Sequence, residues 1–249
     1  MSVDFSEVKS ILCLGDSITE MAWQQGGFVQ RLADISGVWM LSIVASEVRA
    51  AKASDDELAK LTCPCAGYNT DWLLPIAEKV VSGDKLEGGS KIALVIIWMG
   101  TNDSVLDGQE SGQHVPIDRY KRNLLAMYSL YPSSIPTIFV TPTPFQSNWQ
   151  DRDPAVTKQY GEAAKALAEE LGCCVVDSQK EFKGRELGPL LSDGLHLKPA
   201  GYEIIFQALM GLIRKTHPEL APENLPMAYP SWDDHGMREW AHRKNEKRK

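Results

Sequence analysis

Short apolar runs alternate with amphipathic stretches along most of the chain. The run over residues 92–99 is unbroken and rich in β-branched residues, which is typical of a parallel strand buried on both faces. Three shorter runs also predict strands, at residues 9–14, 137–141 and 173–177. Apolar side chains at helical spacing predict helices at residues 117–131, 155–171 and 202–213. This alternation predicts βαβ units, and therefore a parallel sheet with helices on both faces.

The pattern continues to about residue 217 without a repeat or a linker, so we expect one domain over residues 1–217. Residues 218–249 differ from it, because they hold four prolines by Pro230 and end in the basic sequence RKNEKRK. A targeting signal is one interpretation of that basic end. A solvated, frayed tail is the interpretation that the sequence favours.

Composition narrows the class of protein. Of the 249 residues, 43% are hydrophobic and 24% charged, which is typical of an ordinary globular chain. The net charge of −7 argues against a nucleic-acid partner. The apolar runs are far shorter than the roughly 20 residues that cross a bilayer. Residues 1–10 show no secretory signal, so we expect a cytoplasmic protein. The sequence also leaves a homodimer possible.

The five cysteines favour free thiols in a reducing compartment over a disulfide framework. Cys63 and Cys65 have the spacing of half a zinc site, but no second Cys/His pair stands at a ligand-like spacing. We therefore expect no zinc site at these cysteines.

Polar residues follow the predicted strands at three places. Ser17 comes after the first strand, Asn102 comes after the 92–99 strand, and Asp193 and His196 lie just before the last long helix. Ligands of an open parallel sheet bind beyond the carboxyl ends of its strands. We therefore expect these residues to meet at one edge of the sheet, although they lie far apart in the chain.

These residue types are those of a serine hydrolase. A serine hydroxyl needs an adjacent base to become a nucleophile, and imidazole titrates in the right range. A carboxylate holds the imidazole in one tautomer, and the spacing of Asp193 and His196 allows a single tight loop to do so. The Ser17 N–H, a glycine N–H and the Asn102 carboxamide are candidate donors to a developing oxyanion. Taken alone, each residue also has a structural interpretation: Ser17 as a helix cap, His196 as a loop histidine and Asn102 as a turn residue.

Taken together, the motifs make the chain resemble the SGNH (GDSL) hydrolase superfamily. Residues 15–19 (GDSIT), 100–103 (GTND) and 193–196 (DGLH) match its serine, asparagine and histidine blocks. Within it, residues 66–70 (AGYNT), 113–116 (QHVP), 141–144 (TPTP) and 191–196 (LSDGLH) are most similar to the isoamyl acetate-hydrolysing esterases. The resemblance implies a three-layer α/β/α sandwich with a five-stranded, flavodoxin-like parallel sheet, and hydrolysis of small carboxylic esters without a metal or cofactor.

The resemblance also assigns roles within the chain. It implies Ser17, Asp193 and His196 as the catalytic residues, and Ser17, Gly67 and Asn102 as the oxyanion hole. The chain departs from the superfamily before Gly67, where it lacks the usual strand, arginine and serine. Either residues 38–44 form the second strand and an inserted helix follows, or residues 37–62 replace the usual segment.

Several alternatives stay open. A carbohydrate O-deacetylase or a thioesterase would use the same residues with different pockets, and a catalytically impaired binding protein would keep only the fold. Three tryptophans, Trp72, Trp98 and Trp149, are candidates for an acyl pocket, although core packing is the simpler role for Trp98. Surface or packing roles are favoured for four histidines, at positions 114, 217, 235 and 242.

Overall fold

The computed structural model describes residues 9–36, 40–43, 66–82 and 91–224 of the chain. At its centre is a parallel sheet of five strands in the order β2-β1-β3-β4-β5. The strands are β1 (Lys9–Gly15), β2 (Met40–Ile43), β3 (Lys91–Trp98), β4 (Thr137–Val140) and β5 (Cys174–Val176). The predicted parallel α/β sheet is therefore confirmed.

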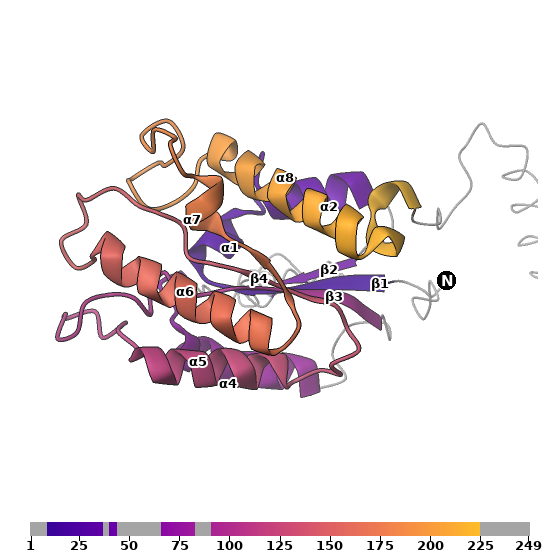
Figure 1. Cartoon of the computed structure of the whole chain (residues 1–249), viewed down its shortest axis with the longest axis horizontal. Coiled ribbons are helices and arrows are strands. Elements are labelled where there is room, and N and C mark those ends of the chain that lie inside the picture. The colour runs from indigo at the N-terminus through magenta and orange to yellow at the C-terminus, as the bar shows by residue number, and fades with distance from the viewer. Residues whose placement is uncertain (1–8, 37–39, 44–65, 83–90, 225–249) are drawn as a thin grey trace, which may run out of the picture.

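Helices cover both faces of this sheet (Figure 1). One face carries α2 (Phe28–Ser36) and α8 (Pro199–Thr216), and the other carries α4 (Thr70–Ser82), α5 (Ile117–Tyr128) and α6 (Pro154–Glu170). Two short helices, α1 (Ser17–Met21) and α7 (Ser178–Glu181), follow β1 and β5 almost directly. The arrangement is the three-layer sandwich that the sequence predicts.

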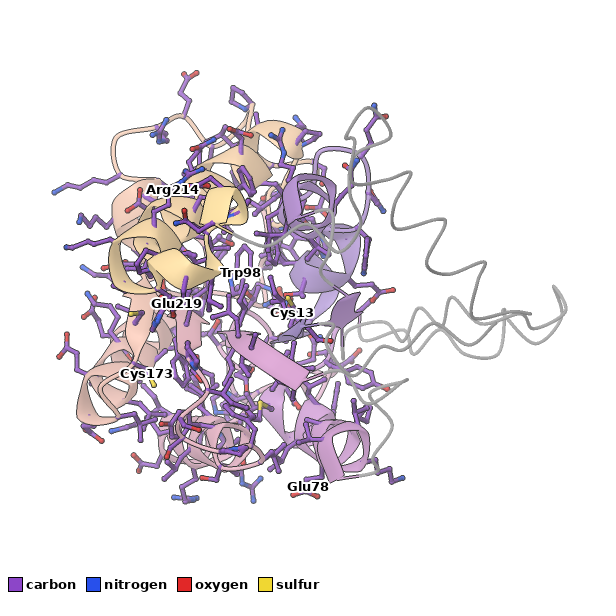
Figure 2. The ribbon with its side chains drawn as sticks, turned by 90° about the vertical axis from the view of Figure 1, so that its right-hand side faces the viewer. Cys13, Glu78, Trp98, Cys173, Arg214 and Glu219 are labelled. Carbon is purple, nitrogen blue, oxygen red and sulfur yellow. The ribbon has the colours of Figure 1, made fainter. Side chains whose placement is uncertain are left out.

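The core is densest around the central strand. From Leu94 to Trp98, no residue of β3 is more than 1% exposed, so both of its faces are buried, as its unbroken apolar run predicts. Each fully buried aliphatic side chain of this kind contributes roughly 2 kcal/mol. The Trp98 ring packs 5.6 Å, centroid to centroid, from Phe28 of α2. Figure 2 shows Trp98 and Cys13 inside the molecule and Glu78 at its edge.

The second strand comes from the segment that departs from the superfamily pattern. β2 pairs with β1 in parallel, from Ser10 with Met40 to Cys13 with Ile43. This pairing agrees with the first interpretation of residues 37–62, in which residues 38–44 supply the second strand. The inserted helix expected after it falls within residues 44–65, outside the described residues.

The strand order places a topological switch point between β1 and β3. These two strands are neighbours, with Gly15 in register with Trp98, yet the chain leaves them toward opposite sides of the sheet. Crevices at such points, beyond the carboxyl ends of the strands, are where open α/β sheets bind ligands. The segments that follow β1 and β3 carry Ser17 and Asn102.

The chain continues after α8 into two short 3-10 turns, at Pro218–Leu220 and Pro222–Asn224. Leu220 is 8% exposed, and Arg214 of α8 pairs with Glu223 at 2.8 Å, so this stretch packs against the helix. The predicted domain boundary at residue 217 stays a prediction, and residues 225–249 lie outside the described residues.

Candidate active site

The turn between β1 and α1 presents Ser17. The Asp16 Oδ1 accepts a hydrogen bond from the Ile18 N–H at 2.9 Å, which satisfies a free donor in the first turn of α1. A Cβ atom on Gly15 would lie 1.9 Å from the Thr19 Oγ1, so the turn has room only for glycine. The turn therefore makes Ser17 the first residue of α1, and the residue is 6% exposed.

The predicted trio of Ser17, His196 and Asp193 comes together in space. The Ser17 Oγ lies 3.0 Å from the His196 Nε2, although 179 positions separate the two residues. The His196 Nδ1 lies 2.6 Å from the Asp193 Oδ2. An ionised carboxylate can only accept, so it fixes the ring proton on Nδ1 and leaves Nε2 free to accept from the hydroxyl. The geometry is that of a nucleophile, a base and a carboxylate that orients the base.

The loop over residues 191–197, called the base loop below, carries the expected base His196 and is closed on itself. The backbone N–H groups of Leu195 and His196 each donate to the Asp193 Oδ1 at 2.9 Å. An antiparallel β-bridge between Leu191 and Leu197 joins the two ends of the loop. Burial alone would raise the pKa of Asp193. Hydrogen bonds from the His196 backbone and ring and from the Leu195 N–H outweigh burial, so this pKa is lowered. The carboxylate is therefore ionised where the imidazole needs it.

Asn102 follows β3 and is 4% exposed. Its Nδ2 donates to the Tyr68 carbonyl oxygen at 2.9 Å, and its Oδ1 accepts from the Arg152 Nη2 at 3.0 Å. A carboxamide nitrogen carries two hydrogens, and the Tyr68 bond uses one of them. The carboxamide is thus held from both ends, with one N–H left to donate.

Gly67 lies beside this carboxamide. It has φ +81°, a conformation that favours glycine, and its carbonyl oxygen accepts from the Gln113 Nε2 at 2.7 Å. Its neighbour Tyr68 is the residue whose carbonyl accepts from Asn102. At the start of α4, the Thr70 N–H donates to the Asp103 Oδ1 at 2.9 Å. The glycine block is therefore bound to the asparagine block at two points, as an oxyanion hole built from both would require.

Two carboxyl groups are buried beside these residues. Burial raises the pKa of Asp16 to about 6, against the Ile18 N–H and the charges of His196 and Arg152. Burial also raises the pKa of Asp103 to about 7, although hydrogen bonds from the first residue of α4 lower it. Each group therefore ionises at a higher pH in the folded protein than it would in water.

The connection from β4 to α6 donates hydrogen bonds to the backbone of the base loop. The Asn148 Nδ2 and the Trp149 Nε1 both donate to the Asp193 carbonyl oxygen at 3.1 Å, and the Gln146 N–H donates to the Gly194 carbonyl oxygen at 2.7 Å. The Trp149 ring also stands edge-on to the imidazole of the base, at 6.5 Å between centroids. Of these three residues, only Trp149 is a candidate from the sequence.

A family model described as the GDSL-like lipase/acylhydrolase family matches residues 13–204, which include Ser17, Asn102, Asp193 and His196. The chain belongs to this family. The predicted superfamily and the predicted ester-hydrolase class of enzyme are thereby confirmed.

Relatives in the family match most of the chain. The isoamyl acetate-hydrolyzing esterase 1 homolog of Homo sapiens is 32% identical over 241 residues, with 90% of this chain and 87% of the relative covered. The isoamyl acetate-hydrolyzing esterase of Saccharomyces cerevisiae is 26% identical over 244 residues, with coverage of 92% and 95%. The expected similarity to this branch is therefore confirmed.

Solved structures share the fold. A lipase/acylhydrolase from Enterococcus faecalis is 21% identical with a TM-score of 0.59, and covers 83% of this chain and 96% of its own. A catalytic mutant of an acetylxylan esterase from Geobacillus stearothermophilus is 22% identical with a TM-score of 0.60, and covers 84% and 94%. These likenesses place the chain in the three-layer fold of GDSL hydrolases.

Arg152 also contacts the candidate site, and the sequence did not indicate it. Its side chain is only 4% exposed, and its guanidinium contacts the Thr101 carbonyl oxygen as well as Asn102. Burial lowers the pKa of Arg152, while the carboxylates of Asp151 and Asp16 oppose that shift. In the sequence it stands between two aspartates in a polar stretch, which is typical of an exposed position.

The three candidate tryptophans have different surroundings. Trp98 is 1% exposed and belongs to the core, as the simpler interpretation holds. Trp72 is 42% exposed, and its ring meets the edge of Tyr68 at 6.1 Å. Since Tyr68 and Trp149 contact Asn102 and the base loop respectively, Trp72 and Trp149 stay candidates for lining an acyl pocket.

The remaining histidines that the structure describes have packing or surface contacts. The His114 Nδ1 lies 2.7 Å from the Val105 carbonyl oxygen, and the His217 Nδ1 lies 3.7 Å from the Glu219 carboxylate. Both placements agree with the expected structural roles. His235 and His242 lie outside the described residues.

Cys13, Cys173 and Cys174 are free thiols, as expected, while Cys63 and Cys65 lie outside the described residues. Across the described ranges, the structure has no group of three or more His, Cys, Asp or Glu side chains that could hold a metal ion. No helix within those same ranges has the length and apolar character needed to cross a bilayer.

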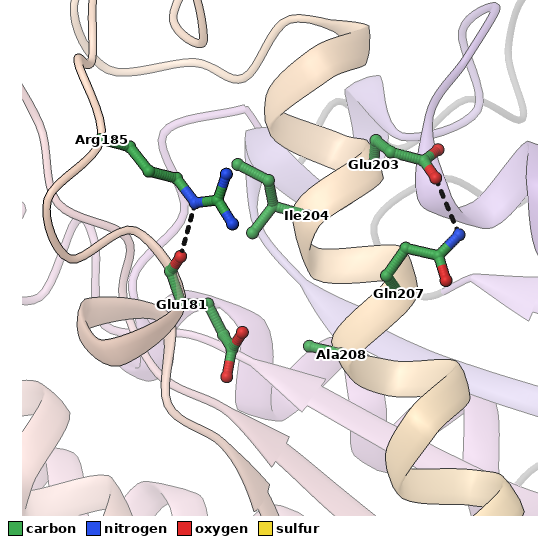
Figure 3. Close-up of a pocket in the computed structure, with 6 residues that line it drawn as sticks. All are labelled: Glu181, Arg185, Glu203, Ile204, Gln207 and Ala208. Carbon is green, nitrogen blue, oxygen red and sulfur yellow. Dashed lines mark hydrogen bonds between the residues drawn. The ribbon is translucent and has the colours of Figure 1, made fainter.

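A pocket of about 410 Å³ lies away from these residues, between the segment around α7 and the outer side of α8 (Figure 3). Two hydrogen bonds join residues of its lining. The Arg185 Nε donates to the Glu181 carbonyl oxygen at 2.9 Å, and the Gln207 Nε2 donates to the Glu203 Oε1 at 2.8 Å. It contains none of the predicted site residues, so we assign it no part in the chemistry.

Proposed function

We propose that this GDSL hydrolase cleaves small to medium carboxylic esters of the acetate type through an acyl-enzyme on Ser17. The observation that carries the proposal is the 3.0 Å contact between the Ser17 Oγ and the His196 Nε2, with Asp193 behind the ring. A serine and an imidazole in this relation, on a family fold that hydrolyses acyl esters, form an activated nucleophile.

In the acylation step, the Ser17 Oγ attacks the ester carbonyl carbon and its proton passes to the His196 Nε2. The bond from the acyl carbon to the alkoxy oxygen then breaks, and the imidazolium gives its proton to the leaving alcohol. In deacylation, a water attacks the acyl carbon, its proton passes to His196, and the acid leaves as Ser17 regains its proton. Asp193 holds the ring and stabilises its charged form in both steps.

The tetrahedral intermediates need donors on the other side of the carbonyl. We assign this role to the N–H groups of Ser17 and Gly67 and to the Asn102 Nδ2. The support is that Tyr68 ties the glycine block to the carboxamide, and that the carboxamide keeps one N–H to donate. Removal of one oxyanion donor typically lowers kcat about 10² to 10³-fold.

The proposed acyl preference rests on the relatives. The human and yeast proteins that cover nearly the whole chain carry names that describe hydrolysis of isoamyl acetate. A short acyl group on an apolar alcohol is therefore the substrate class that we assign to this chain.

The test compares the wild type with Ser17→Ala on p-nitrophenyl acetate. We expect the variant to lose turnover while its circular dichroism and melting temperature stay those of the wild type. Ser129→Ala, at the exposed end of α5, is the matched control and should keep full activity. Wild-type turnover by a folded Ser17→Ala protein would refute the proposal.

A substrate panel then decides the ester class. Isoamyl acetate and longer acyl esters, acetylated xylo-oligosaccharide and an acyl-CoA should be hydrolysed at rates that separate an alkyl esterase from a deacetylase or a thioesterase. Labelling by a fluorophosphonate tests the third alternative, because an impaired binding protein would leave Ser17 unlabelled. We expect labelling of Ser17 and the highest kcat/KM on the alkyl acetate.

A further inference from the structure

Arg152 is a buried cation that the steps above leave without a role. It belongs to the connection between β4 and α6, and its guanidinium points under the segment that follows β3, where it contacts Thr101 and Asn102. We propose that Arg152 is a positioning residue for the oxyanion hole, which fixes and polarises the carboxamide of Asn102. The inference rests on the proposed function, because it acts through the oxyanion role of Asn102.

The orientation argument follows from hydrogen-bond chemistry. The two ends of an asparagine carboxamide have similar shapes, so packing alone does not decide which end faces the substrate. A guanidinium has five donors and no acceptor, and the Tyr68 carbonyl has only lone pairs. Arg152 can therefore donate only to the Oδ1 of Asn102, and the Tyr68 carbonyl oxygen can accept only from the Nδ2. The two contacts together turn the donating end of the carboxamide toward the reacting carbonyl.

The same contact strengthens the donor. A hydrogen bond from a cation to the carboxamide oxygen draws electron density away from the nitrogen, so the remaining N–H becomes a better donor to an oxyanion. Charge-assisted hydrogen bonds are about twice as strong as neutral ones, and the effect grows where water is excluded. Both conditions hold here, since the Arg152 side chain is 4% exposed and Asn102 is also 4% exposed.

Further contacts surround the guanidinium and the backbone of Arg152. The guanidinium carbon lies 5.6 Å from the centre of the Trp149 ring, and the Nε lies 3.7 Å from the Asp151 carboxylate. A bridge joins Arg152 to Val105 in the backbone. Such preorganisation is what an electrostatic contribution to the transition state requires.

Stability alone gives a weak reason for a cation here. Burial of a charge costs several kcal/mol, and an apolar residue of similar volume is often neutral or better for stability. The nearest carboxylate contact, at 3.7 Å, is long for a hydrogen-bonded ion pair. The strong contacts of the guanidinium go instead to the two residues that lead into the oxyanion hole.

The test is a double-mutant cycle between Arg152 and Asn102, measured as kcat and KM on p-nitrophenyl acetate. We expect Arg152→Met to lower kcat about 10 to 100-fold, because misplacing a donor costs less than deleting one. KM should change by less than about threefold, since the lost contact acts in the transition state. In the Asn102→Ala background, Arg152→Met should lower kcat by less than about threefold more. Arg122→Met, on the exposed side of α5, is the matched control and should keep wild-type kinetics.

The outcomes separate the hypotheses. If the fold losses of Arg152→Met and Asn102→Ala multiply, Arg152 does not act through Asn102 and the inference is wrong. If Arg152→Met keeps its kcat while Asn102→Ala loses it, the inference fails and the proposed function stands. If Asn102→Ala keeps its kcat, the oxyanion role fails and the inference goes with it. Arg152→Lys keeps the positive charge but not the planar guanidinium, so it tests the inference if the methionine variant folds poorly. It should recover part of the lost kcat.

Discussion

Asp103→Asn offers a direct test of how the buried carboxyls affect the protein. The Asp103 side chain is fully buried, and its Oδ1 accepts from both the N–H and the hydroxyl of Thr70. Burial raises the pKa of this carboxyl from 3.8 to about 7. An asparagine has a similar shape and can accept the same two bonds, but it carries no titratable proton. The substitution therefore removes the titration and keeps the contacts at the start of α4.

The sign of the pH effect follows from proton uptake. Between pH 3.8 and about 7, the unfolded chain has released the Asp103 proton while the folded chain still holds it. The unfolded state binds fewer protons, so the free energy of unfolding falls as the pH rises through this window, by up to about 1.4 kcal/mol per pH unit. From pH 5 to pH 8 the loss attributable to Asp103 is about 3 kcal/mol.

Urea denaturation at pH 5, 6, 7 and 8 measures this difference. Between pH 5 and pH 8, the unfolding free energy of Asp103→Asn should fall about 3 kcal/mol less than that of the wild type. A constant offset between the two proteins is expected, because the new amide N–H group is buried, and only the slopes are compared. Asp107→Asn, four residues on at an exposed site, should keep the wild-type slope. Parallel curves for the wild type and Asp103→Asn would refute the reasoning.

Three further substitutions test separate parts of the site. Asp193→Asn should lower kcat on p-nitrophenyl acetate about 10³ to 10⁴-fold, because the imidazole loses the carboxylate that fixes its tautomer, whereas a change in KM alone would contradict that role. Gly67→Ala introduces a Cβ at φ +81° and 3.2 Å from the Gln113 Nε2, so urea unfolding should show a loss of about 1 to 2 kcal/mol, and an unchanged midpoint would be inconsistent with the strain. Tyr202→Phe removes a 2.6 Å hydrogen bond from α8 to the first turn of α1. The free energy of unfolding should fall by about 1 to 3 kcal/mol in urea, and an unchanged value would mean that this contact does not hold α1 in place.

The strands and the predicted catalytic cluster were accessible from the sequence for one physical reason. In a parallel sheet every strand ends at the same edge, so polar residues that follow different strands meet there. The apolar run of β3 fixed the position of Asn102, and the run of β1 fixed that of Ser17. Residues 15–19 also indicate a strand-to-helix turn, because Gly15 allows a close approach and Asp16 caps the helix that follows.

Other features depend on tertiary contacts that leave no local signal. Pro75 lies inside α4, where the rule that proline interrupts helices argues against a helix. Asn123 belongs to the buried side of α5 because its Nδ2 bonds to Thr70 and Asp71, and a polar residue there weakens the apolar stripe. For Asn123 the neighbouring helix α4 supplies the reason, and one sequence cannot show which elements are neighbours.

The connection between β4 and α6 shows why this limit matters for function. Its Trp149 donates to the Asp193 carbonyl oxygen on one side of the proposed catalytic residues, and its Arg152 donates to Asn102 on the other. The guanidinium also lies over the Trp149 ring, so the two contacts are not independent. A shift of this connection would move the base loop and the carboxamide together. Alignment of the proposed site therefore depends on a connection whose Trp149 and Arg152 lie outside the motifs that indicate the family.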